Sequence, residues 1–259
     1  MNNFLSIERG IDSIKPDIIF NIAGYPMSNS TLSILLIMVF LIILSVLVIR
    51  RFTISPKKVQ VVIEMIYEGL VSFISQLAGN KSRAERLIPI IGSIFVFILA
   101  SNLLGSIPIL GNITFDGKSI FRSPTSDFNT TFSIAFGALV IIQIMSIKDF
   151  GLLGYLGRFF KFKEVFMGFR ESISKGMTGL IEFFVGLLDI VGELAKLVSL
   201  PLRLFGNMYA GLVLGVVMTS IFAYVLPSIF VALGLLTAVV QAIVFSSLIT
   251  IYYIMSLKS

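Results

Sequence analysis

Six polar side chains recur at helical spacing in an otherwise apolar segment, and their types could handle charge. They are Glu182, Asp189, Glu193, Lys196, Arg203 and Asn207. On one α-helix, at about 100° per residue, they fall within an arc of roughly 80°. Ionisable groups at membrane depth are costly unless they face protein or water. The stripe therefore predicts a surface that lines a helix-bundle interior or an aqueous cleft.

Part of this stripe has a purely structural interpretation. Glu193 and Lys196 are three residues apart and can form an ion pair on the helix surface. Arg203 cannot be explained in this way, because Glu193 is the nearest acid on its helix and lies about 15 Å away along the axis. Residues 204–257 contain no acid at all. Arginine stays protonated, so Arg203 requires a carboxylate from elsewhere.

Two sources of that carboxylate remain open. A second chain could supply it, and this is the interpretation that we favour for an arginine near mid-membrane. Alternatively, an external loop of the same chain could fold inward and present Asp116 or Asp127.

The composition excludes most other kinds of protein. The 259 residues are 56% hydrophobic and 13% charged, whereas soluble domains carry roughly 25% charged residues. The chain contains no Cys and no His, which excludes disulfides and cysteine nucleophiles and removes the commonest metal ligand and proton shuttle. It also has no Gly-rich phosphate loop ending in Lys-Ser or Lys-Thr. We therefore expect an integral membrane protein with no cofactor, no metal and no catalytic site of its own, and no nucleic-acid partner.

Long uncharged runs indicate an all-α polytopic fold of about five membrane helices, forming one membrane domain over residues 1–259. Three runs predict spanning helices at 31–49, 87–109 and 131–147. The charge-free stretch 204–257 holds the end of another helix and one further span, with Pro227 as the break between them. Residues 59–78 combine apolar helical spacing with Glu and Gln, which predicts an amphipathic interfacial helix.

The basic residues predict the orientation. Residues 50–86 and 148–175, together with Lys258, carry 14 Lys and Arg, whereas the opposite loops carry 4. By the positive-inside rule, the N-terminal segment 1–30 is external and the C-terminus is cytoplasmic.

The segment Ser199-Leu-Pro-Leu-Arg-Leu-Phe-Gly-Asn-Met-Tyr-Ala-Gly211 closely resembles the signature of subunit a of F-type rotary ATP synthases. The resemblance extends to Asn102-Leu-Leu-Gly105, to the loop Pro124-Thr-Ser-Asp127-Phe-Asn129, and to Gln241. The residues of the loop and of the signature resemble those of bacterial members of the family. The family implies a tilted helical hairpin, here 177–222 and 227–255, that lies against a rotating ring of c subunits.

The resemblance also implies a role for each matching residue. Arg203 corresponds to the family arginine, which faces the ring carboxylate and separates two half-channels that carry an ion, a proton or alternatively Na⁺. Gln241 matches a glutamine that hydrogen-bonds this arginine, although a simple interhelical hydrogen bond is an alternative. Asn207 is the polar residue one turn beyond the arginine. The remaining candidates are Glu182, Asp189 and Glu193 for the cytoplasmic half-channel, and Asn102, Asp127 and Asn129 for the external one.

Several points stay open within the resemblance. Asp127 could equally be a turn residue or a helix N-cap. Leu212 and Gly234 stand where many bacterial members have titratable groups, which leaves the external half-channel undefined. The implied partners are c-ring subunits, b-type peripheral-stalk subunits and the remaining ATP synthase subunits. The implied location is a bacterial plasma membrane, with an organelle inner membrane as the alternative.

Two other function classes compete with this interpretation. A self-contained secondary ion-coupled transporter predicts paired repeats and an internal counter-ion for Arg203. A lipid-modifying intramembrane enzyme requires clustered acids or a nucleophile with its base. The sequence shows neither set of features.

Overall fold

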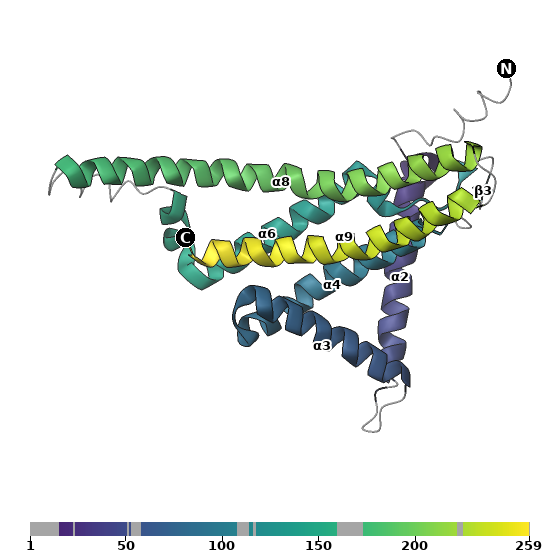
Figure 1. Cartoon of the computed structure of the whole chain (residues 1–259), viewed down its shortest axis with the longest axis horizontal. Coiled ribbons are helices and arrows are strands. Elements are labelled where there is room, and N and C mark those ends of the chain that lie inside the picture. The colour runs from purple at the N-terminus through teal and green to yellow at the C-terminus, as the bar shows by residue number, and fades with distance from the viewer. Residues whose placement is uncertain are drawn as a thin grey trace, which may run out of the picture. The chain divides into compact units, whose positions relative to one another are not determined.

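The computed structural model describes residues 16–22, 24–50, 52, 58–107, 114–115, 118–159, 173–221 and 225–258. Within them, long helices dominate the chain (Figure 1). They are α2 (Asn29–Arg50), α3 (Lys58–Ala78), α4 (Lys81–Gly105), α6 (Phe128–Phe159), α8 (Ile173–Ile221) and α9 (Val225–Lys258). Among the described residues, five helical segments are long and apolar enough to cross a membrane: Asn29–Arg50, Gln60–Ala78, Lys81–Gly105, Phe128–Asp149 and Ser228–Ser256. The predicted all-α polytopic fold is confirmed.

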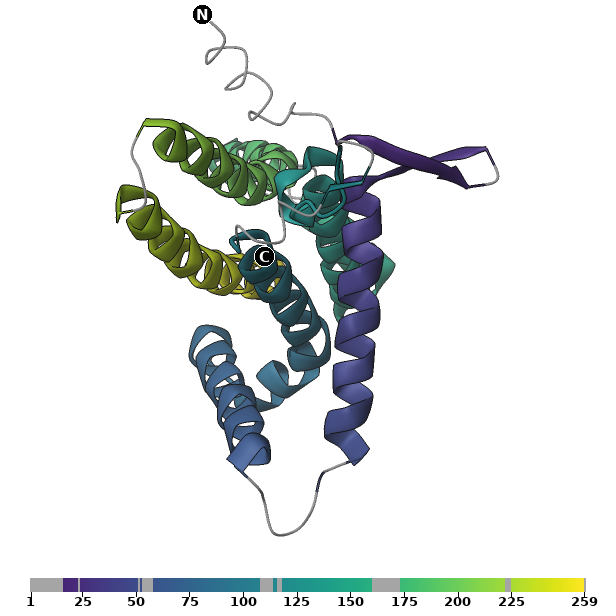
Figure 2. The same ribbon diagram turned by 90° about the vertical axis from the view of Figure 1, so that its right-hand side faces the viewer.

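Contacts divide the chain into two compact units, which are described separately. The first comprises residues 1–131 and 202–250, and the second comprises 132–201 and 251–259. Within the first unit, β1 (Ile18–Ile22) and β2 (Tyr25–Ser28) form an antiparallel hairpin beside the start of α2 (Figure 2). Gly24 provides the turn with a φ of 86°, which glycine adopts without strain. The hairpin was not predicted for the N-terminal segment 1–30, and residues 1–15 of this segment lie outside the described residues.

Helix α2 is almost entirely apolar beyond its first turn, and its buried residues are Asn29, Ser30, Ser33 and Ile37. Most of its other side chains are exposed, as expected of a helix that contacts lipid. Its C-terminal end, Arg50, is the start of the basic stretch.

Helix α3 is one of the five segments that could cross a membrane by length and composition, although the sequence predicts an interfacial helix at 59–78. It packs against α4 (Figure 1). The interfacial location stays a prediction.

The other helix boundaries differ modestly from the predicted spans. Helix α4 begins before the predicted 87–109 span because Asn80 caps it by accepting a 2.9 Å hydrogen bond from the Ser82 N–H. It ends at Gly105, before the predicted end at residue 109, and residues 108–109 lie outside the described residues. Helix α6 extends the predicted 131–147 span in both directions, with non-helical backbone at Gly151.

Helices α8 and α9 correspond to the expected segments 177–222 and 227–255. Helix α8 runs unbroken through Pro201 for 49 residues, about 74 Å at 1.5 Å per residue. This length exceeds the thickness of a bilayer, so α8 must tilt if it lies within one. Helix α9 begins at Val225, two residues before Pro227. Pro227 is tolerated there because the N–H groups of the first turn have no partner within the helix.

Candidate functional site

Arg203 lies on α8 with an exposed side chain. Its neighbours Leu200, Pro201 and Leu204 are buried, so the helix turns Arg203 away from the packed face. Among the residues that the structure describes, none forms an ion pair or a hydrogen bond with the guanidinium. A cation in this position can engage a partner that approaches α8 from outside.

Asn207 and Gln241 form the polar contact nearest to Arg203 along α8. Asn207 donates from Nδ2 to Oε1 of Gln241 over 2.6 Å, which joins α8 to α9. Gln241 is buried, and its Nε2 atom has no hydrogen-bond partner among the described residues. Sequence reasoning paired Gln241 with Arg203, but in this structure Gln241 pairs with Asn207.

The surface beside Arg203 is made of small residues. Gly206 and Ala210 lie three and seven residues beyond Arg203, on the same face of α8. A Cβ atom added to Gly206 or Gly211 would meet nothing within 4 Å. Small residues on a membrane helix allow another helix to approach closely.

Asp127 is the within-chain rival as a counter-ion for Arg203, and the structure gives it another role. Its Oδ1 accepts from the N–H of Asn129 at 3.1 Å, and its Oδ2 accepts from the Thr130 hydroxyl at 3.2 Å. The N–H of Thr131 bonds to its carbonyl oxygen. Asp127 is therefore the N-cap of α6. Asp116 lies outside the described residues.

The other predicted external-side residues differ in their surroundings. Asn102 is fully buried on α4 and accepts a 2.6 Å hydrogen bond from the Thr125 hydroxyl. Its Nδ2 atom has no hydrogen-bond partner in the part of the chain that the structure describes. Asn129 is exposed in the first turn of α6. The sequence did not single out Thr125. This residue lies in the short 3-10 helix Pro124–Ser126, which places its hydroxyl beside Asn102.

In the second unit, Glu193 joins α8 to α6. It accepts from Nζ of Lys196 at 2.8 Å and from Nε2 of Gln143 at 2.9 Å. Gln143 in turn accepts a 2.6 Å hydrogen bond from the Tyr155 hydroxyl. Lys196 also lies 4.8 Å from the ring centre of Tyr252 on α9. The ion pair expected from the three-residue spacing is confirmed.

Gln143 was missed, although the sequence carries a signal for it. Gln143 is the single amide in the uncharged span 131–147. An amide side chain between membrane helices needs a hydrogen-bond partner. The other predicted acids, Asp189 and Glu182, are half-buried on α8. Neither has a hydrogen bond or ion pair to any residue that the structure describes.

Comparison with known families decides between the competing interpretations. The model of the family described as "ATP synthase A chain" matches residues 31–254. The chain belongs to this family. The match includes Arg203, Asn207 and Gln241, and it leaves out only the N-terminal segment and the last few residues.

Relatives match over most of their length. ATP synthase subunit a of Moorella thermoacetica is 29% identical over 241 residues, which cover 93% of this chain and 95% of that protein. ATP synthase subunit a 1 of Crocosphaera subtropica is 28% identical, with 84% and 81% covered. ATP synthase subunit a of Desulforamulus reducens is 33% identical, with 77% and 67% covered.

Membership of the ATP synthase A chain family identifies the chain as a component of the ATP synthase complex. The long apolar helices make it a multi-pass membrane protein. Its activity belongs to ATP synthesis and ion transport.

Proposed function

We propose that this chain is the ion-conducting stator subunit of an F-type ATP synthase, with Arg203 as the essential cation that faces a carboxylate on the c-ring. One observation carries the proposal: Arg203 is exposed, and no described residue pairs with it. The open surface at Gly206 and Gly211 supports a closely packed partner helix beside it.

Physical chemistry links this cation to rotation. A fixed positive charge favours the ionised form of a nearby carboxylate, whereas contact with lipid favours the neutral form. A ring carboxylate therefore releases its ion beside Arg203 and regains one before it returns to lipid. The membrane potential contributes about 2.3 kcal/mol per charge per 100 mV. Ion flow through two offset half-channels would turn the ring and couple to ATP synthesis.

The remaining candidates divide between the two half-channels. Asp189 is the strongest cytoplasmic-side candidate because its carboxylate has no described partner. Glu182 lies two turns before Asp189 on the same face, and Glu193 lies one turn after it. On the external side we assign Asn102, Asp127 and Asn129. Asn207 and Gln241 would support Arg203 from the same hairpin.

We further propose the c-ring and b-type peripheral-stalk subunits as direct partners. The predicted orientation places the N-terminus outside a bacterial plasma membrane and the C-terminus in the cytoplasm.

Purification of the tagged chain in mild detergent, followed by mass spectrometry, tests the assignment. We expect a stoichiometric set of ATP synthase subunits, including a small hydrophobic ring protein with one mid-membrane carboxylate. A lone monomer or homodimer that transports a solute would overturn the proposal. In that case Arg203 would need a counter-ion within its own fold.

A further inference from the structure

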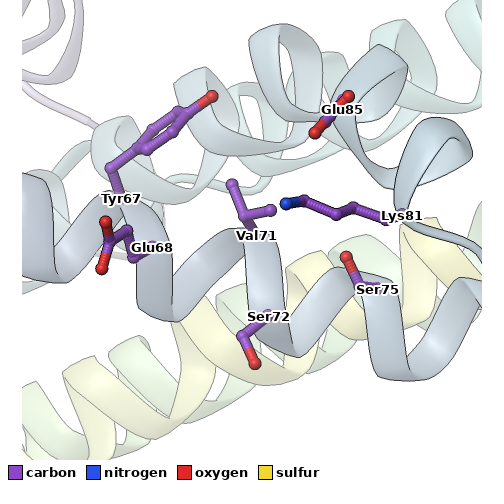
Figure 3. Close-up of a pocket in the computed structure, with 7 residues that line it drawn as sticks. All are labelled: Tyr67, Glu68, Val71, Ser72, Ser75, Lys81 and Glu85. Carbon is purple, nitrogen blue, oxygen red and sulfur yellow. The ribbon is translucent and has the colours of Figure 1, made fainter.

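An open pocket lies between α3 and α4, far along the chain from Arg203. Its cavity measures about 530 Å³, within the range of small-ligand sites. Two Glu, one Lys, one Tyr, two Ser and one Val line it (Figure 3). The positive-inside rule assigns this stretch to the cytoplasmic side.

The charges in this pocket have no partner among the residues that the structure describes. Lys81, Glu68 and Glu85 form no hydrogen bond or ion pair with any described residue. Figure 3 shows Lys81 reaching across toward Val71, with Glu85 on one side of its amine and Ser75 on the other. The Ser75 hydroxyl is shut off from solvent and also lacks a hydrogen-bond partner. The pocket thus offers one ammonium and two carboxylates.

An apolar surface leads into the pocket along one face of α3. Val61, Met65, Glu68 and Ser72 follow one another at four- and three-residue steps, so they share that face. Val61 is 42% exposed and Met65 is 67% exposed. The face therefore changes from apolar to polar over about 10 Å of helix. Such a surface fits an amphiphile with a charged head and an apolar tail.

We propose that this pocket binds the headgroup of an ethanolamine phospholipid from the cytoplasmic leaflet. The phosphate would accept hydrogen bonds from Lys81, and the primary ammonium would donate to Glu68 and Glu85. The acyl chains would lie along Val61 and Met65. The two carboxylates select an ammonium that has N–H donors. Choline has none, and its recognition requires an aromatic cage, whereas Tyr67 is the single aromatic residue lining this pocket.

Native mass spectrometry of the full-length chain, titrated with dioleoyl lipids, tests this proposal. We expect phosphatidylethanolamine to bind about fivefold more tightly than phosphatidylcholine, equivalent to about 1 kcal/mol from exposed ion pairs. Phosphatidylglycerol should bind less tightly still, because the pocket carries a net negative charge. Equal affinities for the ethanolamine and choline lipids would overturn the proposal.

Variants separate the pocket from general affinity for lipid. The double variant E68Q/E85Q should lose the ethanolamine preference, and Lys81→Gln should weaken both zwitterionic lipids. Arg83→Gln is the matched control, because Arg83 is exposed on the same helix but does not line the pocket. Retention of the preference in E68Q/E85Q would refute the site. Displacement by an equal concentration of soluble glycerophosphoethanolamine would overturn the choice of a lipid ligand.

Discussion

Asn207 of α8 and Gln241 of α9 are 34 residues apart in sequence and are joined by a 2.6 Å hydrogen bond from Nδ2 to Oε1. Gln241 is buried at 3% exposure, and Asn207 lies one turn beyond Arg203. This bond ties the two hairpin helices together beside the unpaired arginine. The oxygen of Gln241 has a second lone pair, which can accept from Arg203 when the side chain moves.

The Asn207–Gln241 bond predicts a partial defect. Gln241→Leu should lower ATP-driven ion pumping by the reconstituted complex about threefold without abolishing it, because interhelical hydrogen bonds in membranes average about 0.6 kcal/mol. Thr250→Val is the control, since the Thr250 hydroxyl donates only to the carbonyl of Ser246 on its own helix. Pumping at the wild-type rate in Gln241→Leu would reduce Gln241 to a packing residue.

Removal of the Arg203 cation should abolish coupling while the complex still assembles. Arg203→Ala leaves the exposed surface of α8 intact but removes the charge that favours an ionised ring carboxylate. We expect no ATP-driven pumping, together with an ion leak across the membrane. Arg83 is an exposed arginine on α4. The complex that carries Arg83→Ala should therefore pump ions at the normal rate. Normal pumping by Arg203→Ala would disprove the proposed mechanism.

Asp189 and Glu193, the two acids nearest to Arg203 on its predicted cytoplasmic side, should differ in effect. The double change of Asp189 to Asn and Glu193 to Gln should slow ion exchange on the cytoplasmic side. Asp189→Asn alone should account for most of the loss, because Glu193 is bound to Lys196 and Gln143. Passive ion flux through the membrane sector, reconstituted in liposomes, reports the rate of this ion exchange. Unchanged flux in the double variant would favour a purely structural ion pair.

The capping role of Asp127 predicts which substitutions are tolerated. Asp127→Ala should destabilise the fold by about 1 kcal/mol through loss of the N-cap of α6, whereas Asn or Ser should preserve stability. Thermal unfolding of the detergent-solubilised chain tests this. Ion flux through the Asp127→Asn variant then distinguishes a capping role from a conducting role. Slower ion flux with unchanged stability would indicate that Asp127 conducts ions in the external half-channel.

The open surface at Gly206 allows a steric test of whether the ring docks there. Gly206→Leu should leave the chain folded, since a Cβ there meets nothing within 4 Å. It should nevertheless weaken retention of the ring by the complex, because the larger side chain would occupy the surface that a partner helix approaches. Gly69→Leu on α3 is the control, as Gly69 is also open. Full ring retention in Gly206→Leu would place the docking surface elsewhere.

The hydrophobic runs and the family signature predicted most of the architecture. Composition and uncharged length predicted the spans at 31–49, 87–109 and 131–147, because a bilayer demands about 20 apolar residues and internal backbone hydrogen bonding. The boundaries shifted where local capping decided them, at Asn80 before α4 and at Asp127 before α6.

Spacing within one helix predicted the polar stripe of α8 and the Glu193–Lys196 ion pair, since a regular helix converts sequence separation into direction. Tertiary structure alone decided which distant residues meet. The pairing of Gln241 with Asn207, of Gln143 with Glu193 and of Thr125 with Asn102 depends on how separate helices pack. An amide or hydroxyl has several possible partners of equal chemistry, and only packing selects one.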